Sequence, residues 1–474
     1  MVLGTGSHVG KSLLVAALGR IFSDDGIRVA PFKAQNMALN SAATSDGGEI
    51  GRAQALQAEA CRVTPRIEMN PVLIKPSSDT GAQVVLLGKV WGQMTAADYH
   101  RKRVEELFPV VVESYEKLAA DHELILLEGA GSPAEINLKA RDIVNLRMAR
   151  AAGAACLLVG DIDRGGVFAS LYGTMALLEP EERELIRGFA INKFRGDMGL
   201  LEPGVRMIEK RLERPCAGVI PYLRDLGLDE EDGVALEDRR TVARIWNGAQ
   251  PDKLRVGVIA LPHMSNFTDF DPLALEPEVA LAYLERPEDV SQAHVLILPG
   301  AKQTLDDLDW LKRTGFDQAV LSFPGPILGI CGGMQMLGES IEDPEGVESG
   351  GRPRNAKGLA LLPLTTVMKG IKTVRPATGD CAWGAYTGYE IHMGETAGVE
   401  VAQEGRITGT YIHGLLDTDE LRHRWIRDMR ERCGLPPPVR LAQVGAERDA
   451  RIHRLASHVR SALDMKVIRR WLWP

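Results

Sequence analysis

Two segments of the chain carry residues whose types and spacing suit chemistry, and the first is glycine-rich and amino-terminal. Gly4 and Gly10 enclose five residues, and Lys11 and Ser12 follow at the start of a run of helix-forming residues. Glycines let backbone N–H groups approach a phosphate, a helix start adds positive charge, lysine neutralises the anion and serine can bind Mg²⁺. The segment predicts a nucleotide phosphate site, whereas the plainer alternative is a glycine turn beside a surface lysine.

The second segment surrounds a cysteine. An apolar run at 327–330 leads into Cys331, two glycines and a second apolar run, which predicts a strand, a sharp turn and a helix. Such a turn exposes the thiol at the end of the strand, and a nearby helix start favours the thiolate. A thiolate held in this way can attack the amide carbon of glutamine, form a thioester and release ammonia. The alternative is a small core residue, which is the usual fate of a lone buried cysteine.

A cysteine nucleophile needs a base and a site for the oxyanion. Downstream of Cys331, His413 follows a plausible strand, and His392 is the competing candidate. Either imidazole could take the thiol proton and later activate water. Backbone N–H groups around Gly300 and Gly332 are expected to form the oxyanion hole.

The elements that must position these residues are predicted from short apolar runs that alternate with amphipathic stretches. This alternation is typical of α/β proteins with mostly parallel sheets. Apolar runs flanked by Gly, Pro or Asp are predicted to be buried strands, and they lie at 28–30, 124–127, 156–160, 188–192, 255–260, 294–299 and 327–330. We predict two doubly wound α/β domains, with the glycine-rich segment in the first and Cys331 in the second.

The boundary between the two domains is predicted in a charged stretch, 223–253, that has no apolar period. The predicted division is therefore a first domain at 1–222, a linker, and a second domain at 254–474. We expect the second domain to end in a helical tail around 446–465, where apolar residues recur at helical spacing. These are Ile452, Leu455, Val459 and Leu463.

Composition excludes several classes of protein. The 474 residues suffice for two to four domains, and 64 acidic against 56 basic side chains give a formal charge of −8 without a footprint for nucleic acid. No run approaches the roughly 20 apolar residues of a membrane span, and we expect no signal peptide. Six cysteines without a C-x-x-C pair argue for a reducing cytoplasm and against a zinc site. We expect a cytoplasmic enzyme of undetermined oligomeric state.

The five-residue loop spacing resembles that of dethiobiotin synthetase and related amidoligases. The resemblance implies that Glu128, in the Glu-Gly-Ala-Gly sequence after the apolar run 124–127, binds the magnesium of ATP. It also implies that Lys33, after the second predicted strand, is directed at the phosphates. Asp46 or Glu49 could supply another magnesium carboxylate, and Glu49 is the candidate we retain.

Longer strings resemble the cobyric acid synthase family. They occupy 31–41, 47–57, 69–76, 161–168 and 191–197. The resemblance covers nearly the whole chain and implies amidation of the b, d, e and g carboxylates of adenosylcobyrinic acid a,c-diamide, with glutamine and ATP consumed each time. Ammonia from the glutaminase site would attack an acyl phosphate made at the ATP site. Cobalt would enter only within the corrinoid substrate.

The resemblances also imply roles for two residues, His413 and Asp142. The order of Cys331 and His413 is that of class I glutamine amidotransferases, which favours His413 over His392 as the base. Many of those enzymes carry an acid two residues after the histidine, where this chain has Leu415. The group that orients His413 is therefore open: a backbone carbonyl or a remote carboxylate would serve. Asp142 is a candidate for steering the acyl phosphate or ammonia, with helix capping or a salt bridge as its alternative.

Three other functions compete with this interpretation. Cobyrinic acid a,c-diamide synthase has the same build but amidates two positions rather than four. A dethiobiotin synthetase with a fused domain would not need Cys331 and His413. A nucleotide-dependent switch of the partition-ATPase type shares the loop chemistry but needs no cysteine nucleophile.

Overall fold

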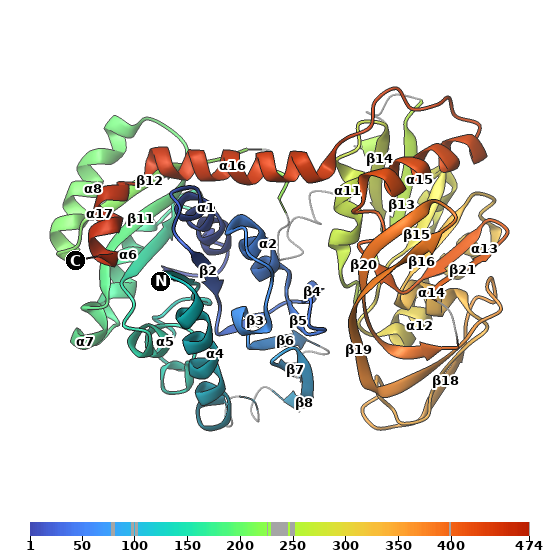
Figure 1. The fold of residues 1–474 in the computed structure, drawn as a ribbon, viewed down its shortest axis with the longest axis horizontal. Coiled ribbons are helices and arrows are strands. Elements are labelled where there is room, and N and C mark those ends of the chain that lie inside the picture. Colours follow the sequence, from blue (N-terminus) through green and yellow to red (C-terminus); the bar gives the residue numbers. More distant parts are fainter. Residues whose placement is uncertain are drawn as a thin grey trace. The chain divides into compact units, whose positions relative to one another are not determined.

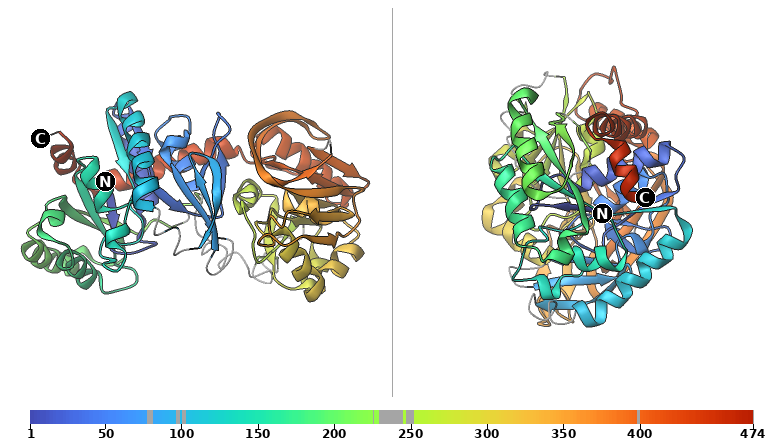
Figure 2. Two further views of the ribbon diagram at one scale, coloured as in Figure 1. Left: turned by 90° about the horizontal axis from the view of Figure 1, so that it is seen from below. Right: turned by 90° about the vertical axis from the view of Figure 1, so that its left-hand side faces the viewer.

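The computed structural model of the protein describes residues 1–76, 81–95, 99, 103–224, 226–228, 245–246, 252–397 and 400–473. The chain forms two compact units, each of which can be followed by its colours in Figure 1 and Figure 2. The first unit comprises Met1–Met37, Ile50–Leu228 and Arg448–Pro474, and the second comprises Ala38–Glu49 and Asp229–Glu447. Each unit has its own sheets and hydrophobic core.

The central sheet of the first unit is four-stranded and parallel. Its order is β1 (Val2–Gly4), β10 (Cys156–Asp161), β11 (Ile186–Phe194) and β12 (Cys216–Pro221). A second parallel pair, β2 (Val29–Phe32) and β9 (Leu124–Leu127), adjoins β1 through a parallel bridge between Val2 and Glu128. Because parallel strands end at one edge, the segments after β1, β2 and β9 meet there.

The remaining elements of the first unit surround these strands. A smaller sheet contains β3 (Gln35–Met37), β6 (Val72–Pro76), β7 (Gly81–Leu86) and β8 (Lys89–Thr95). The helices are α1 (Lys11–Asp24), α2 (Arg52–Ala60), α4 (Phe108–Asp121), α5 (Leu146–Ala151), α6 (Val167–Ala176), α7 (Pro180–Arg183), α8 (Met198–Leu212), most of α16 (Val444–Ala462) and α17 (Met465–Leu472).

The second unit has a six-stranded sheet in which β21 is the antiparallel edge strand and the others are parallel. Its order is β14 (Val279–Leu284), β13 (Leu254–Ile259), β15 (Val295–Leu298), β16 (Ile327–Ile330), β22 (Ile407–Thr410) and β21 (Val401–Glu404). Nearly every residue of the parallel strands is buried, as expected when both faces of a sheet are covered. The two doubly wound α/β domains predicted from the sequence are confirmed.

A second sheet of this unit is mixed, and short helices complete the unit. The sheet order is β18 (Arg354–Lys357), β17 (Ser340–Asp343), β19 (Thr365–Cys381), β20 (Gly384–Thr396) and β23 (Ile412–His413). The helices are α11 (Asp271–Ala274), α12 (Thr304–Thr314), α13 (Phe316–Ser322), α14 (Gly332–Leu337) and α15 (Asp419–Arg432). A short hairpin of β4 (Ser41–Ala43) and β5 (Glu49–Gly51) begins in this unit.

The observed units differ from the predicted domains in two places. The carboxy-terminal helix forms as expected, but it belongs to the first unit, because Ile452, Leu455 and Val459 pack into the core that contains Val15 of α1. Figure 1 shows α16 in red among the blue and green elements of that unit. The segment Ala38–Glu49 belongs to the second unit instead of the first. Most of the predicted linker, 223–253, lies outside the described residues.

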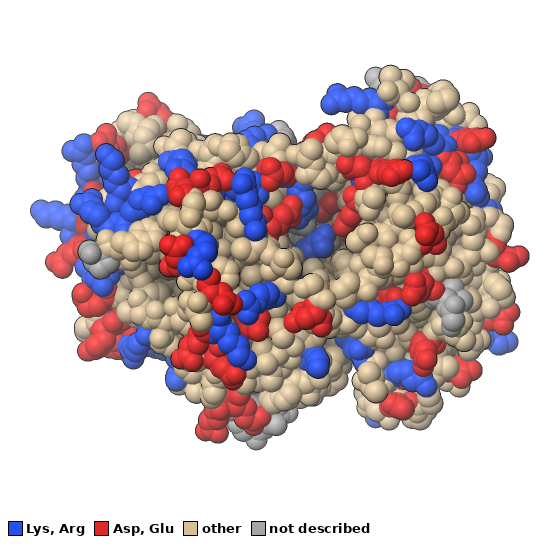
Figure 3. All heavy atoms as spheres, viewed as in Figure 1, with Lys and Arg blue, Asp and Glu red and all other residues tan. Residues whose placement is uncertain are grey.

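Two further observations concern the helices and the distribution of charge on the surface. Among the described residues, none of the helices combines the length and the apolar character that crossing a bilayer requires. On the face drawn in Figure 3, acidic and basic side chains occur together over each unit.

Candidate active sites

The amino-terminal loop has the geometry that its glycines predict. Strand β1 ends at Gly4, and α1 starts at Lys11 directly after Gly10, which has a left-handed φ of 95°. A Cβ atom on Gly10 would lie 2.3 Å from the Nδ2 atom of Asn192, and one on Gly4 would lie 2.9 Å from the Nζ atom of Lys11. Only glycine fits at either position. Without side chains there, the backbone N–H groups of the loop can approach a phosphate.

Lys11 lies over this loop. Its ammonium donates to the carbonyl of Gly6 at 2.8 Å and to the carbonyl of Gly131 at 3.2 Å. Gly131 belongs to the Glu-Gly-Ala-Gly sequence after β9, so the lysine links the segments that follow β1 and β9. The predicted phosphate-binding residues Gly4, Gly10 and Lys11 therefore lie together in the first unit.

Glu128 is the centre of a buried polar cluster at the same edge. Its Oε1 atom lies 2.7 Å from the hydroxyl of Ser12, which donates to it, and 2.9 Å from the ammonium of Lys33. Its Oε2 atom accepts from the Nε2 atom of Gln57 at 2.6 Å. The structure thus brings together Ser12, Lys33 and Glu128, as the sequence predicted, and adds Gln57 from α2.

The cluster suits a magnesium ion bound to nucleotide phosphates. Burial by itself raises the pKa of Glu128, but Lys33 and the hydrogen bonds from Gln57 and Ser12 outweigh it and hold the pKa below its usual range. The buried Oε1 atom of Gln57 has no hydrogen-bond partner among the described residues. Carboxylate, hydroxyl and amide oxygens are ligands that Mg²⁺ prefers.

Glu49 is not part of this cluster. It belongs to the second unit, where its buried carboxylate accepts from the hydroxyl of Ser41 at 2.8 Å and forms an ion pair with Lys372. Asp46, the alternative, is exposed on the same segment. These two contacts lie within the second unit, and a magnesium role for Glu49 stays a prediction. The sequence places Glu49 close to Lys33 along the chain, but the chain enters the other unit between them.

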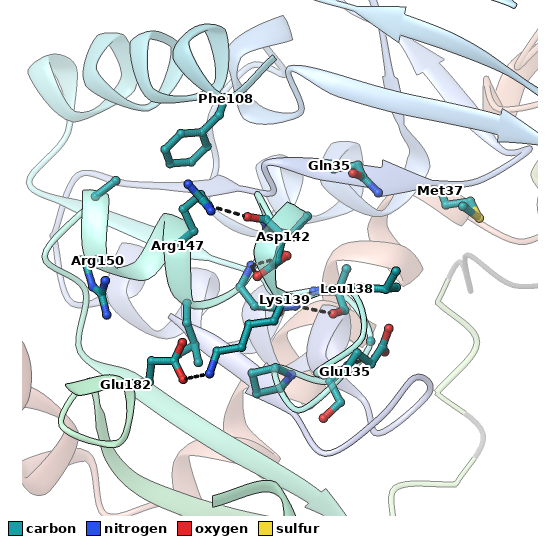
Figure 4. A pocket seen from close by; sticks show the side chains of 18 residues that line it. Gln35, Met37, Phe108, Glu135, Leu138, Lys139, Asp142, Arg147, Arg150 and Glu182 are labelled. Atoms are coloured by element: carbon teal, nitrogen blue, oxygen red, sulfur yellow. Dashed lines mark hydrogen bonds and ion pairs between the residues drawn. The ribbon is translucent and has the colours of Figure 1, made fainter. Parts of the chain in front are cut away.

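Asp142 lines a cavity of about 610 Å³ in the first unit (Figure 4). Its carboxylate accepts from the backbone N–H groups of Val144 and Asn145, at 3.0 and 3.1 Å, in the loop that precedes α5. Gly131, whose carbonyl binds Lys11, lines the same cavity, which therefore adjoins the phosphate loop. The basic side chains around the cavity are Lys139, Arg147 and Arg150.

In the second unit, Cys331 forms the sharp turn predicted between β16 and α14. Its φ of 51° and ψ of −110° are strained for a residue with a side chain, and its N–H donates to the carbonyl of Thr410 at 2.7 Å. A Cβ atom on Gly333 would lie 2.0 Å from the carbonyl oxygen of Leu298, so the turn packs against the segment after β15 without room for a side chain. This packing fixes the position of the thiol at the carboxyl end of β16.

The order of the parallel strands brings the other candidates to the same edge. Strand β16 lies between β15, which leads to Gly300, and β22, which leads to His413. A Cβ atom on Gly332 would be 2.9 Å from the N atom of Ala301, and one on Gly300 would be 3.3 Å from the Cε1 atom of His413. Gly300 and Gly332 thus lie next to the catalytic candidates, which supports the proposed oxyanion hole.

His413 is oriented by an acid that the sequence did not identify. Its Nδ1 atom is 2.7 Å from the Oδ2 atom of Asp269, whose Oδ1 atom accepts from the N–H of Gly414 at 3.1 Å. Histidine and aspartate are both buried, and the side chain of Cys331 is a second hydrogen-bond partner of the imidazole. Asp269 therefore takes the orienting role that Leu415 cannot, as the remote carboxylate that had been left open.

The electrostatics favour a protonated imidazole. Burial alone lowers the pKa of His413, but the charge and hydrogen bond of Asp269, together with Cys331, raise it to about 10. An imidazolium next to Cys331 stabilises a thiolate and can donate a proton to a leaving amine. The arrangement is a Cys–His–Asp triad suited to hydrolysis of an amide.

Replacing Asp269 with asparagine tests this role. Without the carboxylate the pKa of His413 should fall, so the alkaline limb of the pH profile of glutamine hydrolysis should move to lower pH. We expect kcat/KM for glutamine to fall about 10²-fold. The matched control is Asp307→Asn, which changes a different Asp–His contact in this unit, where the buried Asp307 lies 2.8 Å from the partly exposed His263. An unchanged alkaline limb in Asp269→Asn would contradict the assignment.

The competing histidine is engaged elsewhere. In His392, Nδ1 lies 2.6 Å from the carbonyl oxygen of Gly394 and Nε2 lies 2.9 Å from the Oε2 atom of Glu390. Its ring stacks on that of Tyr411 at a centroid distance of 3.8 Å. With both nitrogens in these contacts, His392 is the weaker candidate for the base.

Two family comparisons match the two halves of the chain. Residues 1–236 match the CobQ/CobB/MinD/ParA nucleotide binding domain family. Residues 255–421 match the CobB/CobQ-like glutamine amidotransferase domain family. The first range contains the phosphate loop and Glu128, and the second contains the Cys–His–Asp triad.

Curated relatives match over almost the whole chain. Cobyric acid synthase of Sorangium cellulosum (strain So ce56) is 48% identical, over 99% of this chain and 98% of the relative. The enzyme of the same name from Desulforudis audaxviator (strain MP104C) is 48% identical, over 96% and 95%, and that from Roseiflexus castenholzii (strain DSM 13941 / HLO8) is 46% identical, over 100% and 98%. With this identity along its full length, the chain belongs to the cobyric acid synthase family.

Proposed function

We propose that the protein converts adenosylcobyrinic acid a,c-diamide to adenosylcobyric acid by amidating its b, d, e and g carboxylates, with ATP and glutamine consumed in each step. The observation that carries the proposal is one chain with two separate sets of reactive residues. One set is the buried Cys331–His413–Asp269 triad. The other is the phosphate loop with Glu128. Membership of the cobyric acid synthase family supports the corrinoid as substrate.

In the glutaminase step, the Cys331 thiolate attacks the side-chain amide carbon of glutamine. The oxyanion that forms is stabilised by backbone N–H groups around Gly300 and Gly332. Collapse of this intermediate breaks the C–N bond as His413 donates its proton, so ammonia leaves and a thioester remains. Water, deprotonated by His413, then hydrolyses the thioester to glutamate and restores Cys331.

In the ligase step, an oxygen of a corrinoid carboxylate attacks the γ-phosphorus of ATP, and ADP leaves. Ammonia attacks the acyl carbon of the resulting acyl phosphate, loses a proton and displaces phosphate, which leaves an amide. Lys11 and Lys33 offset negative charge on the phosphates. Glu128, Ser12 and Gln57 would hold Mg²⁺, which supplies charge neutralisation at the transferred phosphoryl group. Cobalt enters only as part of the substrate.

The cavity beside the phosphate loop is our candidate for the corrinoid carboxylate side chain. Lys139, Arg147 and Arg150 line it, and Figure 4 shows them on one side of Asp142. Glu135, Asp142 and Glu182 line the same cavity, and Lys139 pairs with Glu182 at 2.7 Å. Arg147 and Arg150 are therefore the side chains that would attract an anionic substrate. Asp142, held through its backbone contacts at the same cavity, stays our proposal for a group that guides ammonia or the acyl phosphate.

Product stoichiometry tests this function against its nearest rival. With the a,c-diamide, glutamine and MgATP, we expect equal amounts of ADP and glutamate, four of each per corrinoid consumed. With unamidated cobyrinic acid as substrate, release of two of each would instead indicate an a,c-diamide synthase. Glutamate release with no ADP and no change in the corrinoid would contradict the proposed ligase substrate.

A further inference from the structure

A segment of the nucleotide-binding half of the sequence is built into the second unit. Residues 38–49 lie inside the range that matches the nucleotide binding domain family, yet their contacts place them with the glutaminase. We propose that Asn40 and Ser41 of this segment are positioning residues for glutamine hydrolysis, because they hold the turn that presents Asp269 to His413. The inference rests on the proposed glutaminase role of the triad.

The turn that carries Asp269 is short and depends on its surroundings. It is a single 3₁₀ turn, Phe267–Phe270, preceded by Asn266 with a left-handed φ of 53°. One turn of 3₁₀ helix has too few internal hydrogen bonds to set its own orientation. All four of its residues are buried, so packing and hydrogen bonds from other segments fix it.

Asn40 and Ser41 supply such hydrogen bonds at the start of the turn. The Oδ1 atom of Asn40 accepts from the N–H of Phe267 at 3.1 Å, and the N–H of Ser41 donates to the Oδ1 atom of Asn266 at 3.0 Å. Asn40 is 1% exposed and Ser41 is fully buried. With its oxygen held by Ser41, the amide of Asn266 presents its Nδ2 atom to the His413 ring, 3.5 Å from both ring nitrogens.

Ser41 also contacts a second neighbour of the imidazole. Its carbonyl accepts from the hydroxyl of Tyr389 at 3.2 Å, and the Tyr389 ring stacks on His413 at a centroid distance of 5.6 Å. Asp269, Cys331 and Tyr389 are titratable groups that contact His413. Ser41 binds Tyr389 through its carbonyl and Asn266, just before the turn, through its N–H. Asn40 accepts from the N–H of Phe267, the first residue of the turn.

The carboxyl end of the segment, at Glu49, is held by a hydrogen bond and an ion pair. Ser41 donates its hydroxyl to Glu49 at 2.8 Å, and Glu49 forms a buried ion pair with Lys372 of β19. The ion pair gives a structural role to the buried carboxylate of Glu49, which takes no part in the proposed catalytic steps. It holds the segment against the mixed sheet that also carries Tyr389.

The test compares two alanine variants of the same segment in the full-length protein. Asn40→Ala removes the acceptor for Phe267, whereas Thr44→Ala removes a buried hydroxyl that accepts from Gly48 within the segment at 2.9 Å. We expect Asn40→Ala to lower kcat for glutamine hydrolysis about tenfold and to move its alkaline limb to lower pH, because His413 loses part of the support of Asp269. Thr44→Ala should stay within about twofold of the parent with an unmoved limb.

Hydrogen exchange gives a readout that does not depend on activity. The Phe267 amide should be protected in the parent and in Thr44→Ala, and should lose protection in Asn40→Ala. Asn40→Asp keeps an acceptor oxygen and should restore both the protection and the alkaline limb. Equal effects of Asn40→Ala and Thr44→Ala on kcat and the limb would overturn the proposal, as would an Asn40→Asp variant that behaves like Asn40→Ala. An inactive parent with a protected Phe267 amide would instead count against the glutaminase role.

Discussion

Cys331→Ala is expected to abolish amidation with glutamine while amidation with added ammonia continues. The variant has no nucleophile for the amide carbon, so glutamine-dependent turnover should fall by at least about 10⁴-fold. Ammonia-dependent turnover needs only the phosphate loop and the Glu128 cluster, which belong to the other unit. Corrinoid amidation assayed with each nitrogen source measures the two effects separately.

The matched control for this prediction is another cysteine of the same unit. Cys433 is half-buried, and its thiol donates to the carbonyl of His294 at 3.4 Å. Cys433→Ala should keep activity with both nitrogen sources. Loss of both activities in Cys331→Ala, with the protein still folded, would contradict the separation of the two reactions.

Lys11→Ala is expected to disable amidation with either nitrogen source. Lys11 starts α1 and spans the phosphate loop and Gly131, so its removal takes a positive charge from the place where phosphoryl charge develops. Loss of one such stabilising group costs about 10²- to 10³-fold in kcat. ADP formation in the presence of the corrinoid and ammonia measures this loss.

Glutamine hydrolysis provides the internal control for Lys11→Ala. Lys11 belongs to the first unit and the triad to the second, so ATP-independent release of glutamate should match that of the parent. Undiminished ADP formation with ammonia would remove Lys11 from the ATP site. Loss of glutamate release together with amidation would point to a folding defect instead.

The sequence was sufficient to predict those features that depend on neighbouring residues. Both the glycine loop before α1 and the turn at Cys331 are strand–turn–helix units, and their order of residue types can be read from consecutive residues. The contacts that exclude a side chain at Gly10 and Gly333 come from distant residues, Asn192 and Leu298. Lys33 and Glu128 were predicted from the resemblance to dethiobiotin synthetase, and they converge because the carboxyl ends of parallel strands meet at one edge.

Features that depend on long-range packing could not be predicted in this way. Asp269 lies 144 residues before His413, and only the assembled sheet brings them together. The one indication in the sequence was an acid flanked by aromatic residues, Phe-Thr-Asp-Phe at 267–270, in a stretch otherwise suited to a core. Likewise, the apolar stripe of α16 indicated that one face is buried but not which unit buries it.

The position of Glu49 also depends on long-range packing. Glu49 was offered, with Asp46 as the alternative, as a further magnesium carboxylate, but the chain passes into the second unit after Met37 and returns at Ile50. Such an excursion leaves no mark in hydrophobic periodicity, because β4 and β5 are only three residues long. The contacts of Asn40 and Ser41 were hidden for the same reason.

The most direct measurement is mass spectrometry of the corrinoid after reaction with the a,c-diamide, MgATP and glutamine labelled with ¹⁵N in its side-chain amide. The proposed function predicts a product in which four carboxyl groups have become amides, each carrying ¹⁵N. A corrinoid of unchanged mass, from protein that still hydrolyses glutamine, would contradict the substrate. New amides without ¹⁵N would contradict glutamine as their source.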